Sequence, residues 1–335
     1  MKAIVFRQAG LPLEDPQALY EETLEKPVPK DRDLLVEVAA LSVNPVDTKV
    51  RQGGATNGPR VLGWDAVGIV REIGKDVSLF KVGDEVFYAG AIDRPGCYSE
   101  FHLVDERMAG RKPRTIDNAH AAALPLTSIT AWELLFDRLS IREGDGEGQY
   151  LLIIGAAGGV GSILTQLVRK LTKLTIVGTA SRPETTAWVK ELGAHHVINH
   201  NLPLADQLTL PDGHLFNYAV SLTHTDKYLG QIVDLLTPQG KLALIDDPQQ
   251  LDVSLLKRKC LSLHWELMFT RGLYQTPDLI KQHELLNKVA ALIDQGIIKT
   301  TATAHFGRIN AKNLKRAHAL IESGRSRGKI VLEGF

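Results

Sequence analysis

A glycine-rich turn between an apolar strand and a helix constrains the fold of this chain more than any other feature of the sequence. Residues 151–155 are apolar enough for a buried strand, and residues 159–171 have the pattern of a helix. The turn between them reads Gly155-Ala156-Ala157-Gly158-Gly159-Val160-Gly161. Glycines there let the backbone approach a pyrophosphate, and the start of the helix favours an anion. The turn predicts a dinucleotide site with contacts from Ala157, Gly158, Gly159 and Val160.

The chain after this turn alternates between short apolar stretches and amphipathic stretches. The pattern predicts strands at 174–179, 196–199, 217–222 and 241–245, a further strand within 261–269, and helices at 184–192 and 226–236. Such an alternation is typical of a parallel, doubly wound sheet, the Rossmann arrangement. We therefore predict a Rossmann domain around the glycine-rich turn.

The end of the second predicted strand indicates which nucleotide binds. A site for NAD normally carries an Asp or Glu roughly 20 residues after the glycines, where it holds the ribose hydroxyls. No acidic residue stands between Gly155 and Pro183, and the strand is followed by Ser181 and Arg182. A hydroxyl and a guanidinium suit the 2′-phosphate of NADPH. The sequence thus favours NADPH; the alternative is that Arg182 is an ordinary solvent-exposed side chain.

The first third of the chain is rich in predicted β-strands, as expected for a barrel-like domain. The predicted strands are 34–40, 67–73, 84–88 and 98–104, with turn residues such as Gly63 and Gly83 between them. A short helix over 119–124 is expected to stop at Pro125, and Ser128 is expected to cap a helix that runs to residue 139. The C-terminal part mixes predicted helices with predicted strands: helices at 277–295 and 311–323, strands at 305–309 and 329–332.

Composition and charge argue against several classes of partner. The chain of 335 residues has 39 basic and 39 acidic side chains, so it lacks the positive charge expected of a nucleic-acid-binding protein. No apolar run reaches the ~20 residues of a membrane span, and the N-terminus reads as a strand without a signal peptide. Cys97 and Cys260 are too few for a disulfide framework or a four-thiolate zinc site. We expect a cytoplasmic protein that acts on a small molecule, with no nucleic-acid or membrane partner.

Motifs spread along the whole chain resemble those of one enzyme family. They are Val43-Asn44-Pro45-Val46-Asp47-Thr48-Lys49-Val50-Arg51, Leu62-Gly63-Trp64-Asp65-Ala66-Val67-Gly68, Lys81-Val82-Gly83-Asp84-Glu85-Val86, Leu124-Pro125-Leu126-Thr127-Ser128-Ile129-Thr130-Ala131-Trp132, the glycine-rich turn and Arg327-Gly328-Lys329-Ile330-Val331-Leu332. With them the chain resembles the medium-chain dehydrogenase/reductase superfamily. Within that superfamily it is most similar to the zinc-independent quinone oxidoreductase-like branch, often labelled zinc-type alcohol dehydrogenase-like.

The resemblance implies an α/β fold of two domains. A GroES-like β-barrel catalytic domain would comprise residues 1–124 and 272–335, and a Rossmann NADP-binding domain would comprise residues 125–271. Members of the family usually pair through the last strand of the Rossmann sheet, which here would lie near residues 261–269. The resemblance therefore also implies a homodimer.

The positions of the family's catalytic zinc ligands carry other residues in this chain. Asn44 stands where zinc-dependent relatives have a Cys, and Trp64 stands where they have a His. Neither side chain is a plausible zinc ligand, and a catalytic zinc needs three ligands from His, Cys or carboxylate side chains. His195, His196 and His200 cluster in the sequence, but we interpret them as solvent-exposed or capping residues. No zinc is expected; a zinc alcohol dehydrogenase with unusual ligands is the alternative.

The absence of a metal would restrict the chemistry. Without a Lewis acid, reduction of a plain ketone becomes harder by several kcal/mol. Quinones and α,β-unsaturated carbonyls need less help, because the charge that the hydride creates is delocalised and hydrogen-bond donors can stabilise it. We therefore expect NADPH-dependent reduction of quinones or enones. The rival hypotheses are a zinc-type dehydrogenase of alcohols and aldehydes, and a non-enzymatic NADPH-binding redox sensor.

Two residues are candidates for the catalytic work. The amide of Asn44 could bond the nicotinamide ribose or the substrate oxygen. Lys49 stands where many quinone reductases of the family have Tyr and where the enone-reductase subgroup has Lys. Its ammonium could stabilise an enolate or hold the ribose, or it could be an ordinary surface lysine. We expect Asp47 to support this loop by pairing with Arg51 at i+4.

The resemblance implies further contacts with the cofactor and the substrate. Thr127 would lie at the nicotinamide end, and Ser221 and Phe269 would also contact the cofactor. Trp64 and Phe269 would form walls of the substrate pocket, although simple core packing explains these two aromatic residues equally well.

Overall fold

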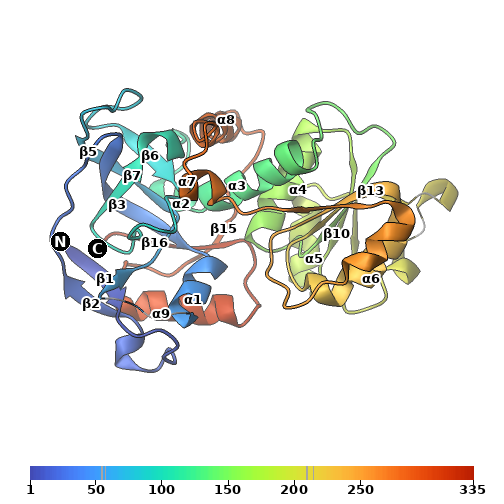
Figure 1. Cartoon of the computed structure of the whole chain (residues 1–335), viewed down its shortest axis with the longest axis horizontal. Coiled ribbons are helices and arrows are strands. Elements are labelled where there is room, and N and C mark those ends of the chain that lie inside the picture. Colours follow the sequence, from blue (N-terminus) through green and yellow to red (C-terminus); the bar gives the residue numbers. More distant parts are fainter. Residues whose placement is uncertain (54–55, 57, 209, 214) are drawn as a thin grey trace. The chain divides into compact units, whose positions relative to one another are not determined.

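The computed structural model describes residues 1–53, 56, 58–208, 210–213 and 215–335, and it divides the chain into two units. Unit 1 comprises residues 1–129 and 269–335, and unit 2 comprises residues 130–268 (Figure 1). The structure thus divides the chain after residues 129 and 268, where the sequence placed the domain boundaries after 124 and 271. Among the described residues, no helix combines the length and the apolar character that crossing a membrane requires.

Unit 1 is built on a seven-stranded sheet with the path β15-β16-β3-β5-β6-β8, to which β7 adds by pairing with β3. A second sheet has the order β2-β1-β4. The strands are β1 (Lys2–Phe6), β2 (Tyr20–Thr23), β3 (Asp33–Val43), β4 (Arg60–Val61), β5 (Ala66–Ile73), β6 (Glu85–Tyr88), β7 (Phe101–Asp105), β8 (Ala109–Arg111), β15 (Ala302–His305) and β16 (Lys329–Glu333). All pairs except β15–β16 are antiparallel. This is the GroES-like part of the expected fold.

The long strand β3 is the centre of unit 1. It pairs with β7 along its first half, with β5 from Leu34 to Leu41, and with β16 at its end, where Val43 lies opposite Ile330. It extends beyond the predicted residues 34–40 because Leu41 and Val43 are also buried and paired. Because β3 ends at Val43, Asn44 follows it directly and stands at the start of the next helix, Pro45–Gln52.

The helices of unit 1 differ from the prediction at one proline. They are α1 (Pro45–Gln52), α2 (Asn118–Ala122), α3 (Pro125–Trp132), α7 (Thr270–Leu273), α8 (Lys281–Asp294) and α9 (Ala311–Glu322), with short 3₁₀ segments at Pro16–Ala18 and Glu106–Met108. As predicted, a short helix, α2, ends before Pro125, but the next helix begins at Pro125 itself, so Ser128 lies inside α3 rather than capping it. A proline suits the first position because its missing N–H would have no partner there.

Two further details correct the sequence analysis. Helix α3 crosses from unit 1 into unit 2 and is followed by a π-helical segment, Glu133–Arg138. The strand expected at 305–309 is β15 at Ala302–His305, whose partner is β16. Periodicity alone did not locate this short strand, because its side chains are partly exposed and give no clear alternation.

Unit 2 is a six-stranded parallel sheet with the order β11-β10-β9-β12-β13-β14. Its strands are β9 (Tyr150–Ile154), β10 (Thr175–Thr179), β11 (His196–Ile198), β12 (Phe216–Ser221), β13 (Leu236–Leu244) and β14 (Ser262–Trp265). Its helices are α4 (Gly159–Leu171), α5 (Pro183–Glu191) and α6 (Thr225–Leu235), with 3₁₀ segments at Ala205–Gln207, Pro211–Gly213 and Val253–Lys259. This order is the doubly wound Rossmann topology that the strand–helix alternation predicted.

A partly buried lysine, Lys259, caps the C-terminal end of one helix in unit 2. The Lys259 ammonium donates to the carbonyls of Val233 at 2.9 Å, Asp234 at 2.8 Å and Leu236 at 2.7 Å, at the C-terminus of α6. The last carbonyls of a helix have no partner within it and carry partial negative charge. All three donors of the ammonium are used there.

We predict that Lys259→Met lowers the free energy of unfolding by about 1–2 kcal/mol, because several α6 carbonyls lose a cationic donor. Urea denaturation at neutral pH measures the change. Lys257→Met, which removes the same charge from an exposed position of the same 3₁₀ segment, is the matched control and should leave stability within about 0.5 kcal/mol. Equal effects of the two substitutions would contradict the capping role.

Candidate active site

The glycine-rich turn of unit 2 has the geometry of a nucleotide loop. Gly155 adopts a left-handed φ of 81°, which favours glycine, and its N–H donates to the Thr179 hydroxyl at 3.0 Å. A Cβ added to Gly161 would lie 2.5 Å from the Gly155 carbonyl oxygen and 2.6 Å from the Ala156 Cα. Gly161 is therefore required by the close approach of helix α4 to the turn.

Gly158 differs from Gly161 in what its missing side chain would meet. A Cβ there would lie 3.5 Å from the Gly155 carbonyl oxygen, an ordinary contact. No side chain caps the start of α4, and Ala157 and Gly158 to Val160 are partly exposed. The packing of the protein itself therefore does not require glycine at position 158.

The residues expected to meet a 2′-phosphate lie after β10. Ser181 is half-buried, and Arg182 stands at the N-cap of α5, where the Thr185 hydroxyl donates to its carbonyl at 2.9 Å. The Arg182 Nε lies 2.9 Å from Glu184 Oε1, an acidic neighbour that the sequence analysis did not consider. Both side chains are partly exposed, and exposed ion pairs contribute little stability. A phosphate could therefore displace Glu184 from the guanidinium.

Ser221 lies at the end of β12 and is fully buried. Its hydroxyl lies 2.7 Å from the Thr225 hydroxyl, which is 2.5 Å from Asp246 Oδ1. The Thr225 N–H donates to Asp246 Oδ2 at 2.8 Å. Ser221 thus belongs to a polar network that fixes the first turn of α6.

In unit 1, Asn44 joins β3 to α1. It is 1% exposed and caps α1, and its N–H donates to Asp47 Oδ2 at 2.7 Å. Pro45 occupies the first helical position, where a missing N–H has no cost. The local sequence Asn-Pro-x-Asp therefore fixes both the start of the helix and the place of the Asn44 side chain.

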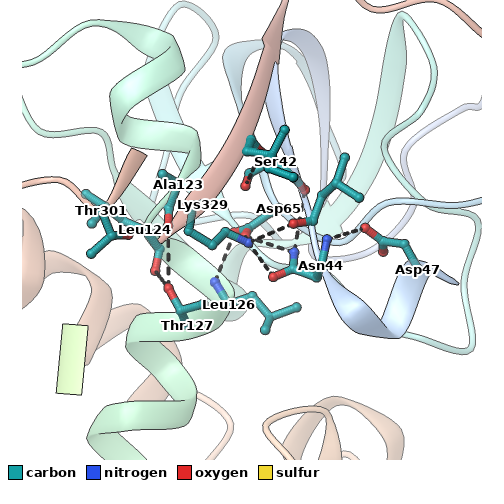
Figure 2. Close-up of polar contacts among 12 residues, drawn as sticks. Ser42, Asn44, Asp47, Asp65, Ala123, Leu124, Leu126, Thr127, Thr301 and Lys329 are labelled. Carbon is teal, nitrogen blue, oxygen red and sulfur yellow. Dashed lines mark hydrogen bonds and ion pairs between the residues drawn. The ribbon is translucent and has the colours of Figure 1, made fainter. Parts of the chain in front are cut away.

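The Asn44 amide is held at both ends (Figure 2). Its Nδ2 donates to Asp65 Oδ2 at 3.0 Å and to the Ser42 carbonyl at 3.5 Å, and its Oδ1 accepts from the Lys329 ammonium. An ammonium has donors only, so the amide oxygen must face Lys329. The lysine therefore sets the orientation of the amide.

Lys329 and Asp65 form a buried ion pair, with their side chains 3% and 0% exposed and Nζ 3.0 Å from Oδ2 (Figure 2). The ammonium also donates to the Val43 carbonyl at 3.2 Å, so its three donors are used by Val43, Asn44 and Asp65. Asp65 Oδ1 accepts from the Leu126 N–H at 3.0 Å. Burial raises the pKa of Asp65, and the Lys329 charge opposes that shift.

Lys329 and Asp65 stand within two of the family motifs, but the sequence did not predict a role for either residue. One signal was available: a lysine begins the apolar strand Lys329–Glu333, whose first four residues are buried. A charged residue in such a strand needs a buried partner. The sequence does not reveal that partner, because Asn44 and Lys329 are 285 positions apart.

The expected Asp47–Arg51 pair is wrong. Asp47 Oδ2 accepts from the Asn44 N–H and from the Tyr98 hydroxyl at 3.0 Å, while Arg51 pairs with Glu322 of α9 at 2.6 Å. Helix α1 lies beside α9, which offers Arg51 a carboxylate from another element (Figure 1). Burial raises the pKa of Asp47 to about 7.

Of the remaining candidates of unit 1, Thr127 directly follows Leu126 and Trp64 directly precedes Asp65 in the chain, so these two adjoin the residues around Lys329 (Figure 2). Lys49 is exposed on α1. Thr127 is buried, and its hydroxyl donates to the carbonyl of Leu124, the residue before α3, at 3.3 Å. Trp64 and Phe269 are 0% and 2% exposed and meet edge to face, with ring centroids 6.1 Å apart. These two aromatic residues pack in the core of unit 1.

The residues at the expected zinc position do not fit a zinc ion. The Trp64 Nε1 donates to the Ala91 carbonyl at 2.9 Å and has no lone pair to offer. Burial raises the pKa of the Cys97 thiol, which keeps the sulfur protonated. Among the residues that the structure describes, no three His, Cys, Asp or Glu side chains are grouped so as to hold a metal ion. The three-ligand set of a catalytic zinc is therefore not available in this part of the chain.

Comparisons with known proteins agree with this fold. The family model for the alcohol dehydrogenase GroES-like domain matches residues 30–114, and the model for zinc-binding dehydrogenases matches residues 192–332. A zinc-type alcohol dehydrogenase-like protein of Staphylococcus aureus (strain MSSA476) is 41% identical over 317 residues, which cover 94% of each chain.

Solved structures of similar proteins cover the whole chain. An alcohol dehydrogenase protein from Rhizobium etli CFN 42, named as zinc-dependent, is 54% identical with a TM-score of 0.96, over 100% of this chain and 98% of that one. The quinone oxidoreductase from Coxiella burnetii is 27% identical with a TM-score of 0.82, over 100% and 99%. The names of these relatives thus divide between zinc-dependent and quinone-reducing enzymes.

We predict that Lys329→Met lowers the free energy of unfolding by about 3–5 kcal/mol at neutral pH, because Asp65 is left as an uncompensated buried charge. The pKa of Asp65 is already raised in the folded state, so folding favours its protonated form, and losing Lys329 strengthens this preference. The deficit of the variant should therefore shrink as the pH falls. Urea denaturation of both proteins at pH 8 and pH 5.5 measures it.

The double variant Lys329→Met/Asp65→Asn is the control for this prediction. It removes both charges and keeps an acceptor for the Leu126 N–H, so it should be more stable than Lys329→Met alone. If the two single losses simply add in the double variant, Lys329 and Asp65 are not energetically coupled.

Proposed function

Because the chain belongs to the medium-chain dehydrogenase/reductase superfamily, we propose that it reduces quinones or α,β-unsaturated carbonyl compounds with NADPH and without a catalytic zinc ion. Membership makes the chain an oxidoreductase. One observation carries the zinc-independent part of the proposal: at the expected zinc position, Asn44 is fixed between Lys329 and Asp65, and the residues that the structure describes contain no group of three ligands for a metal ion.

The cofactor proposal is based on the two ends of the nucleotide loop. The start of α4 at Gly158, which no side chain caps, suits a pyrophosphate. Arg182 at the end of β10 suits a 2′-phosphate, with Ser181 beside it. The adenosine ribose of NADH has a neutral hydroxyl in place of this phosphate and would bind the guanidinium more weakly, so NADPH is the preferred reductant in our proposal.

The proposed reaction transfers a hydride from NADPH to the electron-poor carbon of the conjugated acceptor. The acceptor π-electrons move to its oxygen as an enolate or hydroquinone anion, NADP⁺ is formed, and a proton completes the product. We assign stabilisation of this anion to the exposed Lys49 ammonium. The amide of Asn44 is already bonded to Lys329 and Asp65, so we assign Asn44 a positioning role: it holds the start of α1, the helix that carries Lys49.

A zinc-dependent alcohol dehydrogenase is the second candidate. The names of the relatives from Staphylococcus aureus and Rhizobium etli favour it. It requires zinc ligands that the described residues do not group together. Elemental analysis of active protein, combined with assays in EDTA, separates the two candidates.

We further propose that a second copy of the chain is the partner, paired through β14. Within the described residues, β14 is an edge strand that pairs only with β13. Trp265 and Leu267, at and just after its end, are 52% and 51% exposed. An exposed edge next to large apolar side chains is typical of a pairing surface.

A panel of acceptors tests the reaction class. With EDTA present, NADPH should be oxidised by quinones and enones, and much more slowly by simple aldehydes and ketones. Stoichiometric zinc in active protein, or a preference for simple alcohols and aldehydes, would contradict the proposal.

We predict that Lys49→Met lowers kcat/KM for a conjugated enone by roughly 10²–10³-fold, the usual effect of losing one donor to a developing oxyanion. Lys312→Met, an exposed lysine of α9, is the matched control and should keep normal turnover. A separate measurement of the Kd for NADPH distinguishes loss of cofactor binding from loss of chemistry. Normal turnover in Lys49→Met would remove this residue from the mechanism.

We predict that Arg182→Ala weakens NADPH binding by roughly 10- to 150-fold, which corresponds to about 1.5–3 kcal/mol for hydrogen bonds to a charged group. Binding of NADH should not change. Fluorescence titration of the two nucleotides measures both constants, with Lys190→Ala on the same helix as the control. An unchanged ratio of the two constants would mean that the 2′-phosphate binds elsewhere.

A further inference from the structure

Basic residues follow three strands of the parallel sheet in unit 2 at the same edge. Arg182 comes after β10, His200 after β11 and His224 after β12, and Lys227 lies in the first turn of α6. The carboxyl ends of parallel strands share one edge of the sheet, where nucleotides bind in such folds. The sequence analysis interpreted His200 as a solvent-exposed or capping residue and did not connect it with this edge.

His200 is half-buried and lies against helix α6. His200 lines a cavity of about 420 Å³ together with Lys227, Tyr228 and Gln231 of α6 and with loop residues around Leu202. The Tyr228 hydroxyl donates to the His200 carbonyl at 3.1 Å, and the two rings meet edge to face with centroids 6.4 Å apart. The loop that carries His200 is therefore fixed against α6.

The charges that face His200 are mainly positive. Burial lowers its pKa, and Lys227, His224 and Arg182 lower it further. Asp234 is the acidic residue that lines the same cavity, and Glu184 is bound to Arg182. With no ligand, these neighbours keep the imidazole neutral, and the cations repel one another.

A phosphate monoester would reverse this balance. It carries a charge of about −1.5 to −2 at neutral pH and accepts strong hydrogen bonds. Placed beside Arg182, Lys227 and His200, it would favour the imidazolium form of His200, whose ring N–H could then donate to a phosphate oxygen. The 2′-phosphate is the group that distinguishes NADPH from NADH, so such a contact acts on the choice between the two.

We propose that His200 determines nucleotide specificity by taking up a proton when NADPH binds and donating a hydrogen bond to the 2′-phosphate, so that the preference for NADPH over NADH rises as the pH falls. This inference rests on the proposed use of NADPH. The linkage has a definite sign: a group protonated in the complex but neutral in the free protein makes binding weaker as the pH rises through the pKa of the complex.

Isothermal titration calorimetry tests the proton directly. NADPH is titrated at pH 7 in two buffers of different ionisation enthalpy, neither containing phosphate. The wild-type protein should bind at most one additional proton when NADPH binds, and none when NADH binds. The 2′-phosphate itself, with a pKa near ~6, would release protons on binding to cations, so an uptake points to the protein.

Variants assign the uptake to His200. His200→Gln should lose both the uptake and the pH dependence of the ratio of NADH and NADPH Kd values between pH 6.5 and 8.5. His200→Lys carries a permanent charge and should keep the NADPH preference at every pH without proton uptake. His196→Gln, at an exposed position of β11, is the matched control and should behave as wild type.

Different results would overturn the role of His200 and the proposed use of NADPH. NADPH binding without proton uptake, or an uptake that persists in His200→Gln, overturns the role of His200 and leaves NADPH as the cofactor. A preference for NADH at every pH, unchanged in Arg182→Ala, overturns the proposed cofactor as well. Thermal melting of each variant shows that a lost signal is not a lost fold.

Discussion

The candidate active site in unit 1 depends on one buried ammonium. Lys329 donates to the Val43 carbonyl and to Asn44, and it is paired with Asp65, so it joins three segments that are far apart in the sequence. A buried charge is tolerated only when its partners are all in place. The start of α1, the turn before β5 and the strand β16 must therefore form together, and Asn44 has one orientation as a result. Because Lys49 lies on α1, its position depends on the same contacts of Lys329, Asn44 and Asp65.

The two units use different physical means to prepare a reaction. In unit 2, backbone groups and glycines shape the nucleotide loop: Gly161 permits the contact of helix and turn, and no side chain caps the start of α4 at Gly158. In unit 1, buried polar side chains hold a helix start in place. A loop made by the backbone depends on a few small residues, whereas a cluster of side chains depends on several partners at once. This difference explains why the first was visible in the sequence and the second was not.

The sequence predicted the elements whose causes are local. The bounds of α4 were predicted without error, and the alternation of strands and helices gave the parallel sheet of unit 2. Local signals failed where a distant partner decides. Arg51 pairs with Glu322 on another helix rather than with Asp47. The sequence did not reveal the contacts of Lys329, because its partners lie near the other end of the chain.

The adjacent residues Trp64 and Asp65 hold both places where the chain passes between its units. Asp65 accepts from the N–H of Leu126, shortly before the first passage, and Trp64 packs on Phe269, the first residue after the second passage. In mechanical terms, both connecting segments are attached to the same turn, Trp64-Asp65. A displacement of this turn would therefore act on both connecting segments. A shift of the first segment alone would strain the hydrogen bond between Asp65 and Leu126, and a shift of the second alone would separate the rings of Trp64 and Phe269.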